Sequence, residues 1–245
     1  REWEVRLERP LRVGVIEKSP IESVVAPEAK AALRKAVHFL EDIGCEVEGI
    51  GWPVDGVEVM KHYYLMNSVE TAAMMQGLEA SLGRALTKDD MELMTWGIYQ
   101  SGQHILAKDY SVALAKWDTY AHAMEKVHEE FDLILTPTVS DVAPLQTQFP
   151  MEESVRQALN QIEELSVPEQ QSVIWRMFDR TLALTPFTQL SNITGAPAIS
   201  LPVYLSDKGL PIGVQFMAPR GQEALLLQVA EWFEEQGQFE MRQFS

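Results

Sequence analysis

The chain has 245 residues, of which 46% are hydrophobic and 23% are charged, a balance typical of ordinary globular proteins. Its 36 acidic and 20 basic residues give a formal net charge of -16, which repels phosphate backbones and anionic lipid head groups. Nucleic acid and membranes are therefore excluded as expected partners, and no apolar run reaches the roughly 20 residues of a membrane-spanning helix.

The N-terminal residues and the single cysteine limit where the protein is expected to occur and which sites it can form. The N-terminal residues REWEVRLERP are charged and lack the apolar core of a signal peptide, so a cytoplasmic location is the simplest expectation. Because the chain does not begin with Met, we expect it to be cut from a longer protein. Cys45 is the sole cysteine, which excludes an internal disulfide and a cysteine-based metal site. The length predicts a single domain over residues 1–245.

The first fifty residues alternate between strand and helix patterns. Val and Ile dominate residues 11–16, which predicts a buried strand. Apolar residues then recur on one helical face between Pro27 and Gly44, which punctuate the ends of a helix. Residues 46–50 predict a second strand. The connection between these two strands has roughly thirty residues and contains a helix, which indicates a parallel pair of strands and an α/β fold.

The rest of the chain changes pattern several times. Residues 58–130 predict a helical subregion rich in Met, Ala and aromatic residues, and FDLILTPT predicts a third strand that Pro137 ends. Residues 141–172 are rich in Pro, Gln and Glu and predict a variable surface excursion with a helical stretch near 154–165. A helix over 175–192, two strands joined by a hairpin at Asp207 and Gly209, and a final helix over 222–235 complete the prediction.

No arrangement for nucleophilic catalysis is visible in this sequence. Such catalysis requires a Ser, Cys or Lys beside a base, usually on a glycine-flanked turn, and no such turn or nucleotide-binding loop is present. His122, Glu125 and Glu129 share a helical face, but a solvated charged face explains them more simply than a metal site. The sequence therefore predicts no catalytic residue, no metal and no cofactor.

Three segments together carry a family resemblance. In order they are FDLILTPT, FTQLSNITGAPAISLPV and GLPIGVQFMAPRGQEALLLQVAEWFEE. Gly195 allows a sharp turn and Gly213 allows close backbone approach within a strand. The ordered set resembles the C-terminal region of the amidase signature family. The resemblance implies the C-terminal half of an α/β/α sandwich, with a mixed sheet and helices on both faces.

The resemblance also implies an activity and a set of binding residues. Members of this family hydrolyse linear amides with a serine nucleophile, a second serine and a lysine base, in an N-terminal half that this sequence lacks. By position, YLMNSVETAA resembles a stretch in which a tyrosine, here Tyr64, faces the substrate. A basic residue of the family is replaced by Trp117, which implies a neutral or apolar substrate group. Asn192 and Thr194 are further candidates near the pocket. Core packing of Tyr64 and Trp117, and helix capping by Asn192 and Thr194, remain open alternatives.

Two functional hypotheses follow. In the first, the chain is the C-terminal portion of an amidase that acts on a small-molecule amide, is inactive alone and needs the missing N-terminal half. In the second, it is a non-catalytic binding or interaction module derived from an amidase. Under either hypothesis, truncation exposes a strand edge and apolar faces, so we expect the fragment to self-associate.

Overall fold

The computed structural model describes residues 9–240, and the charged N-terminal residues 1–8 lie outside the described part. The contacts of the backbone divide the chain into two compact units. The sheet unit contains residues up to Gly56, Thr119–Leu145 and the residues from Ala183 on, and the helical unit contains Val57–Asp118 and Gln146–Leu182. That all 245 residues form one domain stays a prediction.

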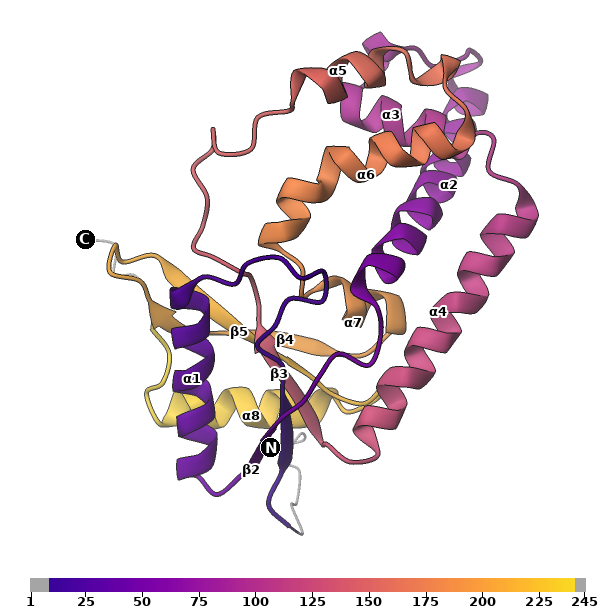
Figure 1. Ribbon diagram of the computed structural model, residues 1–245. Coiled ribbons are helices and arrows are strands. Elements are labelled where there is room, and N and C mark those ends of the chain that lie inside the picture. The colour runs from indigo at the N-terminus through magenta and orange to yellow at the C-terminus, as the bar shows by residue number, and fades with distance from the viewer. Residues whose placement is uncertain (1–8, 241–245) are drawn as a thin grey trace. The chain divides into compact units, whose positions relative to one another are not determined.

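The sheet unit is built on a five-stranded mixed sheet (Figure 1). The strands have the order β2-β1-β3-β5-β4, in which β1 runs parallel to β2 and β3 while β5 runs antiparallel to β3 and β4. Their bounds are β1 Arg12–Val15, β2 Glu46–Gly49, β3 Leu133–Pro137, β4 Ala198–Leu205 and β5 Pro211–Met217. The mixed α/β sheet and its parallel first pair confirm the sequence-based prediction.

One face of the sheet packs against α1 (Pro27–Asp42) and α8 (Glu223–Glu235). Phe39 of α1 and Phe216 of β5 both contact Phe233 of α8, with ring centroids 4.4 and 5.7 Å apart. Alternate residues of β5 point to the opposite face, where Gln215 donates a hydrogen bond to the carbonyl of Phe187, just before α7 (Gln189–Thr194). The sheet is therefore covered on both faces.

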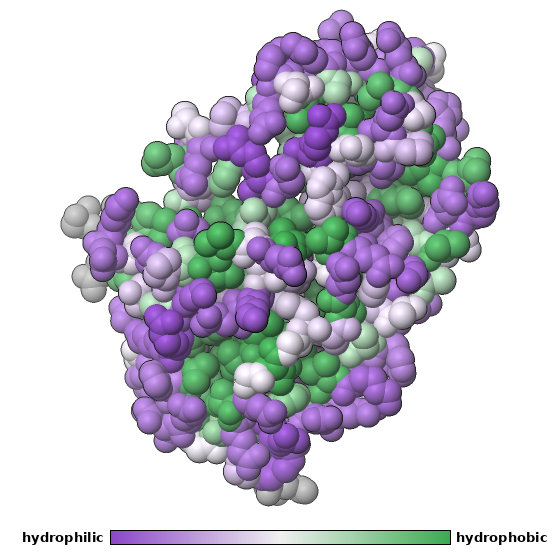
Figure 2. Space-filling model, viewed as in Figure 1, coloured by the Kyte–Doolittle hydropathy of each residue, from purple (hydrophilic) through white to green (hydrophobic). Residues whose placement is uncertain are grey.

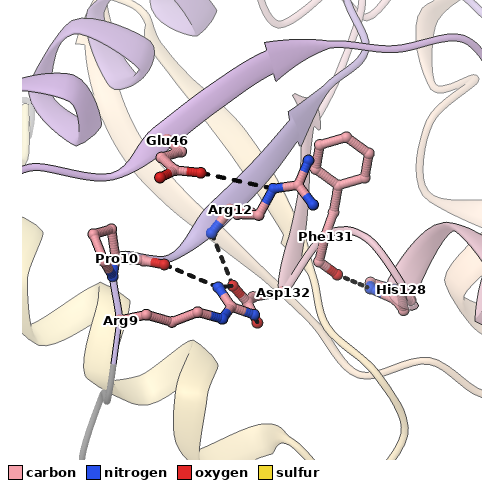
Figure 3. A network of polar contacts seen from close by, with 7 residues as sticks. All are labelled: Arg9, Pro10, Arg12, Glu46, His128, Phe131 and Asp132. Carbon is pink, nitrogen blue, oxygen red and sulfur yellow. Dashed lines mark hydrogen bonds and ion pairs between the residues drawn. The ribbon is translucent and has the colours of Figure 1, made fainter.

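A polar network fixes the start of β1 beside the start of β3 (Figure 3). Arg9 donates two hydrogen bonds of 2.8 Å to the carboxylate of Asp132, and the backbone N–H of Arg12 donates a third. The guanidinium of Arg12 lies 5.1 Å from the ring centroid of Phe131. Because Asp132 satisfies donors of a segment 120 residues away, it aligns the two parallel strands.

The helical unit contains no strand among its residues. Its longest helix is α2 (Gly56–Leu82). The carboxylates of Glu58 and Glu70 on α2 accept hydrogen bonds from Lys116 and Tyr110 on α4 (Ala107–His128), at 3.0 and 2.6 Å. α4 contributes residues to both units. The helices are α2 Gly56–Leu82, α3 Leu93–Gly102, α4 Ala107–His128, α5 Glu153–Asn160 and α6 Val167–Leu184, with short 3-10 turns η1 Lys88–Asp90 and η2 Ile162–Glu164.

The predicted helix over residues 175–192 is wrong in its continuity. The structure has two helices there, α6 ending at Leu184 and α7 beginning at Gln189. Pro186 separates them, because proline has no N–H to donate and disfavours a helical conformation at the preceding residue. The predicted hairpin is confirmed, since Gly209 has a φ of 68° and its N–H donates to Ser206.

Candidate substrate pocket

A cavity of the helical unit lies between α2 and α6 and has a volume of about 590 Å³. The α2 residues that line it recur at spacings of three and four, and so do those of α6, so each helix turns one face to the cavity. The lining residues are Val57, Lys61, His62, Tyr64 and Leu65 of α2, and Pro168, Gln171, Ser172 and Trp175 of α6. Volume and lining are typical of small-molecule pockets.

Tyr64 forms an aromatic wall of this α2–α6 pocket. Its ring stacks on Phe178 at 5.1 Å and meets Trp175 edge-on at 6.0 Å, and the residue is 7% exposed. Burial raises the pKa of the Tyr64 phenol far above its ordinary value, with smaller effects of Tyr63 and Asp179 in the same direction. Tyr64 is therefore a neutral wall residue and is not suited to act as a base near pH 7.

The charges at the pocket come from α2. The ammonium of Lys61 lies 5.9 Å from the ring centroid of Trp175. Burial lowers the pKa of the neighbouring His62 imidazole, an effect that Lys116 strengthens and Glu58 opposes. Since its pKa lies below 6.5, His62 is mainly neutral at pH 7. Among the described residues, Lys61 is thus the one formally charged side chain that lines the pocket at neutral pH.

The other candidate residues lie elsewhere. Trp117 on α4 is half-buried, does not line the α2–α6 pocket, and has a buried indole N–H without a hydrogen-bond partner in residues 9–240. Asn192 on α7 is exposed, whereas Thr194 is buried and donates to the carbonyl of Leu190 at 2.8 Å. Asn192 and Thr194 belong to the sheet unit, and Tyr64 and Trp117 to the helical unit. The binding roles of all four stay predictions.

Thr194 also borders a second, smaller cavity, of about 220 Å³, in the sheet unit. Its carbonyl accepts hydrogen bonds from the guanidinium of Arg220, which lines the same cavity. His128, another lining residue, hydrogen-bonds through Nδ1 to the carbonyl of Phe131, while its buried Nε2 has no partner among the described residues. Burial lowers the pKa of this imidazole.

Sequence reasoning missed the α6 side of the α2–α6 pocket. Pro168, Gln171 and Ser172 fall in the segment predicted as a variable surface excursion, and Trp175 was assigned to a helix without a role. Their spacing of three, four and seven residues was a usable signal, because it places all four on one helical face.

Between residues 9 and 240, no three His, Cys, Asp or Glu side chains are placed to hold a metal ion. The hydroxyls of Thr138 and Ser200 lie 2.6 Å apart, and neither hydrogen-bonds to a lysine, histidine or carboxylate of the described chain. Ser19 hydrogen-bonds to Ser23 at 2.8 Å. In that same part of the chain, no helix has the length and apolar character required to cross a membrane.

Comparison with known proteins decides the family. The sequence profile of the family described as Amidase matches residues 2–227. The chain belongs to the amidase signature family. Amidase-signature relatives include the lipoamidase of Enterococcus faecalis, 33% identical over 217 residues, and the 6-aminohexanoate-cyclic-dimer hydrolase of Pseudomonas sp. (strain NK87), 30% identical over 231 residues. These alignments cover 89% and 91% of this chain but 30% and 43% of the relatives.

Solved amidase-signature structures confirm the fold. The structure of 6-aminohexanoate cyclic dimer hydrolase complexed with substrate superposes with a TM-score of 0.78 at 29% identity. The superposition covers 94% of this chain and 46% of that one. This chain therefore has an amidase-signature fold and spans less than half the length of the relatives that it matches.

Proposed function

We propose that these 245 residues are the C-terminal portion of a hydrolase that cleaves a linear amide through a serine acyl-enzyme. The family match over residues 2–227 is the observation that supports this proposal most strongly. Relatives named as a lipoamidase and as a cyclic-dimer hydrolase support an amide bond as the target. The cytoplasmic location expected from the charged N-terminal residues stays a prediction.

The proposed reaction divides the work between two portions of the protein. A serine of the missing N-terminal half attacks the amide carbonyl while a lysine accepts its proton through a second serine, and the amine leaves with a proton. Water then attacks the acyl-enzyme and releases the acid. The residues described above supply the α2–α6 pocket, whose wall of Tyr64 and Trp175 is suited to hold the apolar part of the amide.

The edges of the sheet support a partner for this portion. β2 is a short edge strand that carries Glu46 and Glu48, which discourage further pairing. β4, at the other edge, has eight residues and no charge, and it pairs only with β5 in the described chain. The N–H of Glu240 donates to the carbonyl of Pro202 and satisfies one group of β4. We propose that the N-terminal half covers this edge, and that the isolated fragment self-associates.

Exposed apolar side chains support the same proposal. Met74, Leu78 and Leu82 recur every four residues on α2 and are 62%, 44% and 51% exposed. Apolar surface is also visible on the sheet unit, in the region where Figure 1 draws α1 and the strands (Figure 2). Surfaces of this kind mark sites that another chain or segment covers.

The test compares the 245-residue chain with the product of the complete reading frame that encodes it. Both are incubated with aryl and aliphatic amides and with a fluorophosphonate that labels reactive serines. We expect the short chain to be inert and unlabelled, and the longer product to hydrolyse amides until it is labelled. Labelled turnover by the short chain would refute the proposed division. A longer product without turnover or label would favour the non-catalytic module.

Self-association has its own measurement. Sedimentation of the short chain at micromolar concentration is expected to show dimers or larger species. A compact monomer that binds no hydrophobic dye would contradict the proposal that an edge and apolar faces await a partner.

A further inference from the structure

Lys61 differs from most lysines of the described chain in having no carboxylate partner. Five others form ion pairs of 2.7 to 3.1 Å: Lys30, Lys35, Lys88, Lys116 and Lys126. Glu58, one turn before Lys61 on α2, pairs with Lys116 instead. In a chain with 36 acidic and 20 basic residues, a lysine that lines a cavity of about 590 Å³ without forming an ion pair is a distinctive feature.

The position of Lys61 suits a ligand that joins an anion to an apolar body. Its ammonium lies over the ring of Trp175, and a cation in this position is stabilised by the aromatic face while it keeps its hydrogen-bond donors. Val57, Tyr64 and Leu65 add apolar wall on the α2 side. A carboxylate beside Lys61 would therefore leave the aryl or alkyl part of the same molecule against this wall.

The remaining polar side chains do not cancel this charge. His62 is mainly neutral, and Gln171 and Ser172 add uncharged hydrogen-bonding groups on the α6 side. The Glu58–Lys116 pair beside His62 is balanced. Among the residues that line the pocket, Lys61 thus carries the one formal charge at neutral pH, although the whole chain carries -16.

We propose that the α2–α6 pocket binds an apolar carboxylate, with Lys61 as its counter-ion and the Tyr64–Trp175 wall around its aryl or alkyl part. This differs from the neutral or apolar group implied by Trp117, which does not line this cavity. That such a carboxylate belongs to the amide substrate rests on the function proposed above, whereas binding itself does not depend on hydrolysis.

The test uses two ligands of the same shape, 4-phenylbutyrate and its neutral amide 4-phenylbutyramide, titrated into the 245-residue chain by calorimetry at low salt. We expect the carboxylate to bind about fivefold more tightly, which corresponds to about 1 kcal/mol. Because screening weakens an exposed ion pair, the preference is expected to shrink in about 1 M salt.

Substitutions distinguish the contribution of the Lys61 charge to binding from that of the Tyr64–Trp175 wall. Lys61→Met should abolish the preference while binding of the amide persists, and Lys61→Arg should retain it. Lys108→Met, at an exposed lysine of α4 that does not line the pocket, is the matched control and should leave both affinities unchanged. Trp175→Ala should weaken both ligands. Circular dichroism confirms that each variant is folded.

Three results would overturn the proposal: equal affinities for acid and amide, a preference that survives Lys61→Met, or no binding of either ligand. These results are independent of the amide-hydrolysis test. If the complete reading frame hydrolyses amides but the pocket ignores the carboxylate, only the inference fails. If the carboxylate binds as expected but no amide is cleaved, only the proposed function fails.

Discussion

Gly102, at the end of α3, offers the sharpest test of the packing in the helical unit. A Cβ built there would collide with the backbone carbonyl of Ser68 on α2 and lie 2.9 Å from the Cβ of Ala72. The hydroxyl of Ser101 donates to that of Ser68 at 2.8 Å across the same contact. α2 and α3 thus approach so closely that only glycine fits at position 102.

The expected effect of Gly102→Ala is a loss of stability. In an open helical position, alanine stabilises a helix by about 0.8–1 kcal/mol relative to glycine. At position 102 the methyl group meets backbone, which cannot rotate away as a side chain can, and overpacking of this kind costs about 1–3 kcal/mol. Separation of the helices would also weaken the Ser101–Ser68 hydrogen bond, which contributes about 1 kcal/mol. We expect a net loss of about 1–3 kcal/mol.

Gly77→Ala is the matched control. Gly77 lies within α2, and a Cβ built there has no neighbour within 4 Å. The same substitution should therefore raise stability by about 0.5–1 kcal/mol. Urea unfolding followed by circular dichroism at 222 nm measures both variants. The two should change stability in opposite directions from the parent and differ by about 1.5–4 kcal/mol. If Gly102→Ala were as stable as Gly77→Ala, the close approach of α2 and α3 would be refuted.

Three further predictions concern burial. Burial raises the pKa of the Cys45 thiol from 9.0 to about 11, so iodoacetamide at pH 8 should alkylate it about 100-fold more slowly than in urea; equal rates would contradict this. Burial lowers the pKa values of His62 and His128, so on acidification these two residues take up protons in the unfolded chain before they do so in the folded chain. The free energy of unfolding should therefore fall from about pH 7 to pH 5. Replacing both histidines with Gln should flatten that decline, and an unchanged slope would contradict this prediction. Phe233→Ala should cost about 3–5 kcal/mol in urea unfolding, because the ring is 1% exposed, whereas Leu227→Ala on the same helix, 47% exposed, should cost under about 0.5 kcal/mol; similar costs would show that α8 does not bury Phe233.

Short-range sequence patterns were sufficient to predict most strands and helices of the sheet unit. The alternation of strand and helix over the first fifty residues predicted β1, α1 and β2, and the parallel pairing of β1 with β2 followed from the length of the crossover. These predictions succeed because hydrophobic periodicity and the residues at helix ends act over a few neighbours. The break at Pro186 was equally local, and overlooking it joined α6 to α7 in error.

The candidate site was only partly predictable. Tyr64 was named from its resemblance to a family motif, and it does line the α2–α6 pocket. Trp117 was named by the same reasoning and does not line it. Lys61 and Trp175 were not predicted as site residues. A motif or a helical periodicity lies within one segment, so it does not indicate that residues more than a hundred positions apart share a cavity.

The sequence by itself determined the family, the α/β class and most strands and helices of this protein, since these depend on ordered motifs and on short-range patterns of apolar residues. Only the tertiary structure decided which helical faces meet, that Glu58 is paired with Lys116, and that Lys61 lies over the ring of Trp175. The physical reason is that a charge takes its role from the groups that surround it in space, and packing between distant segments selects those groups.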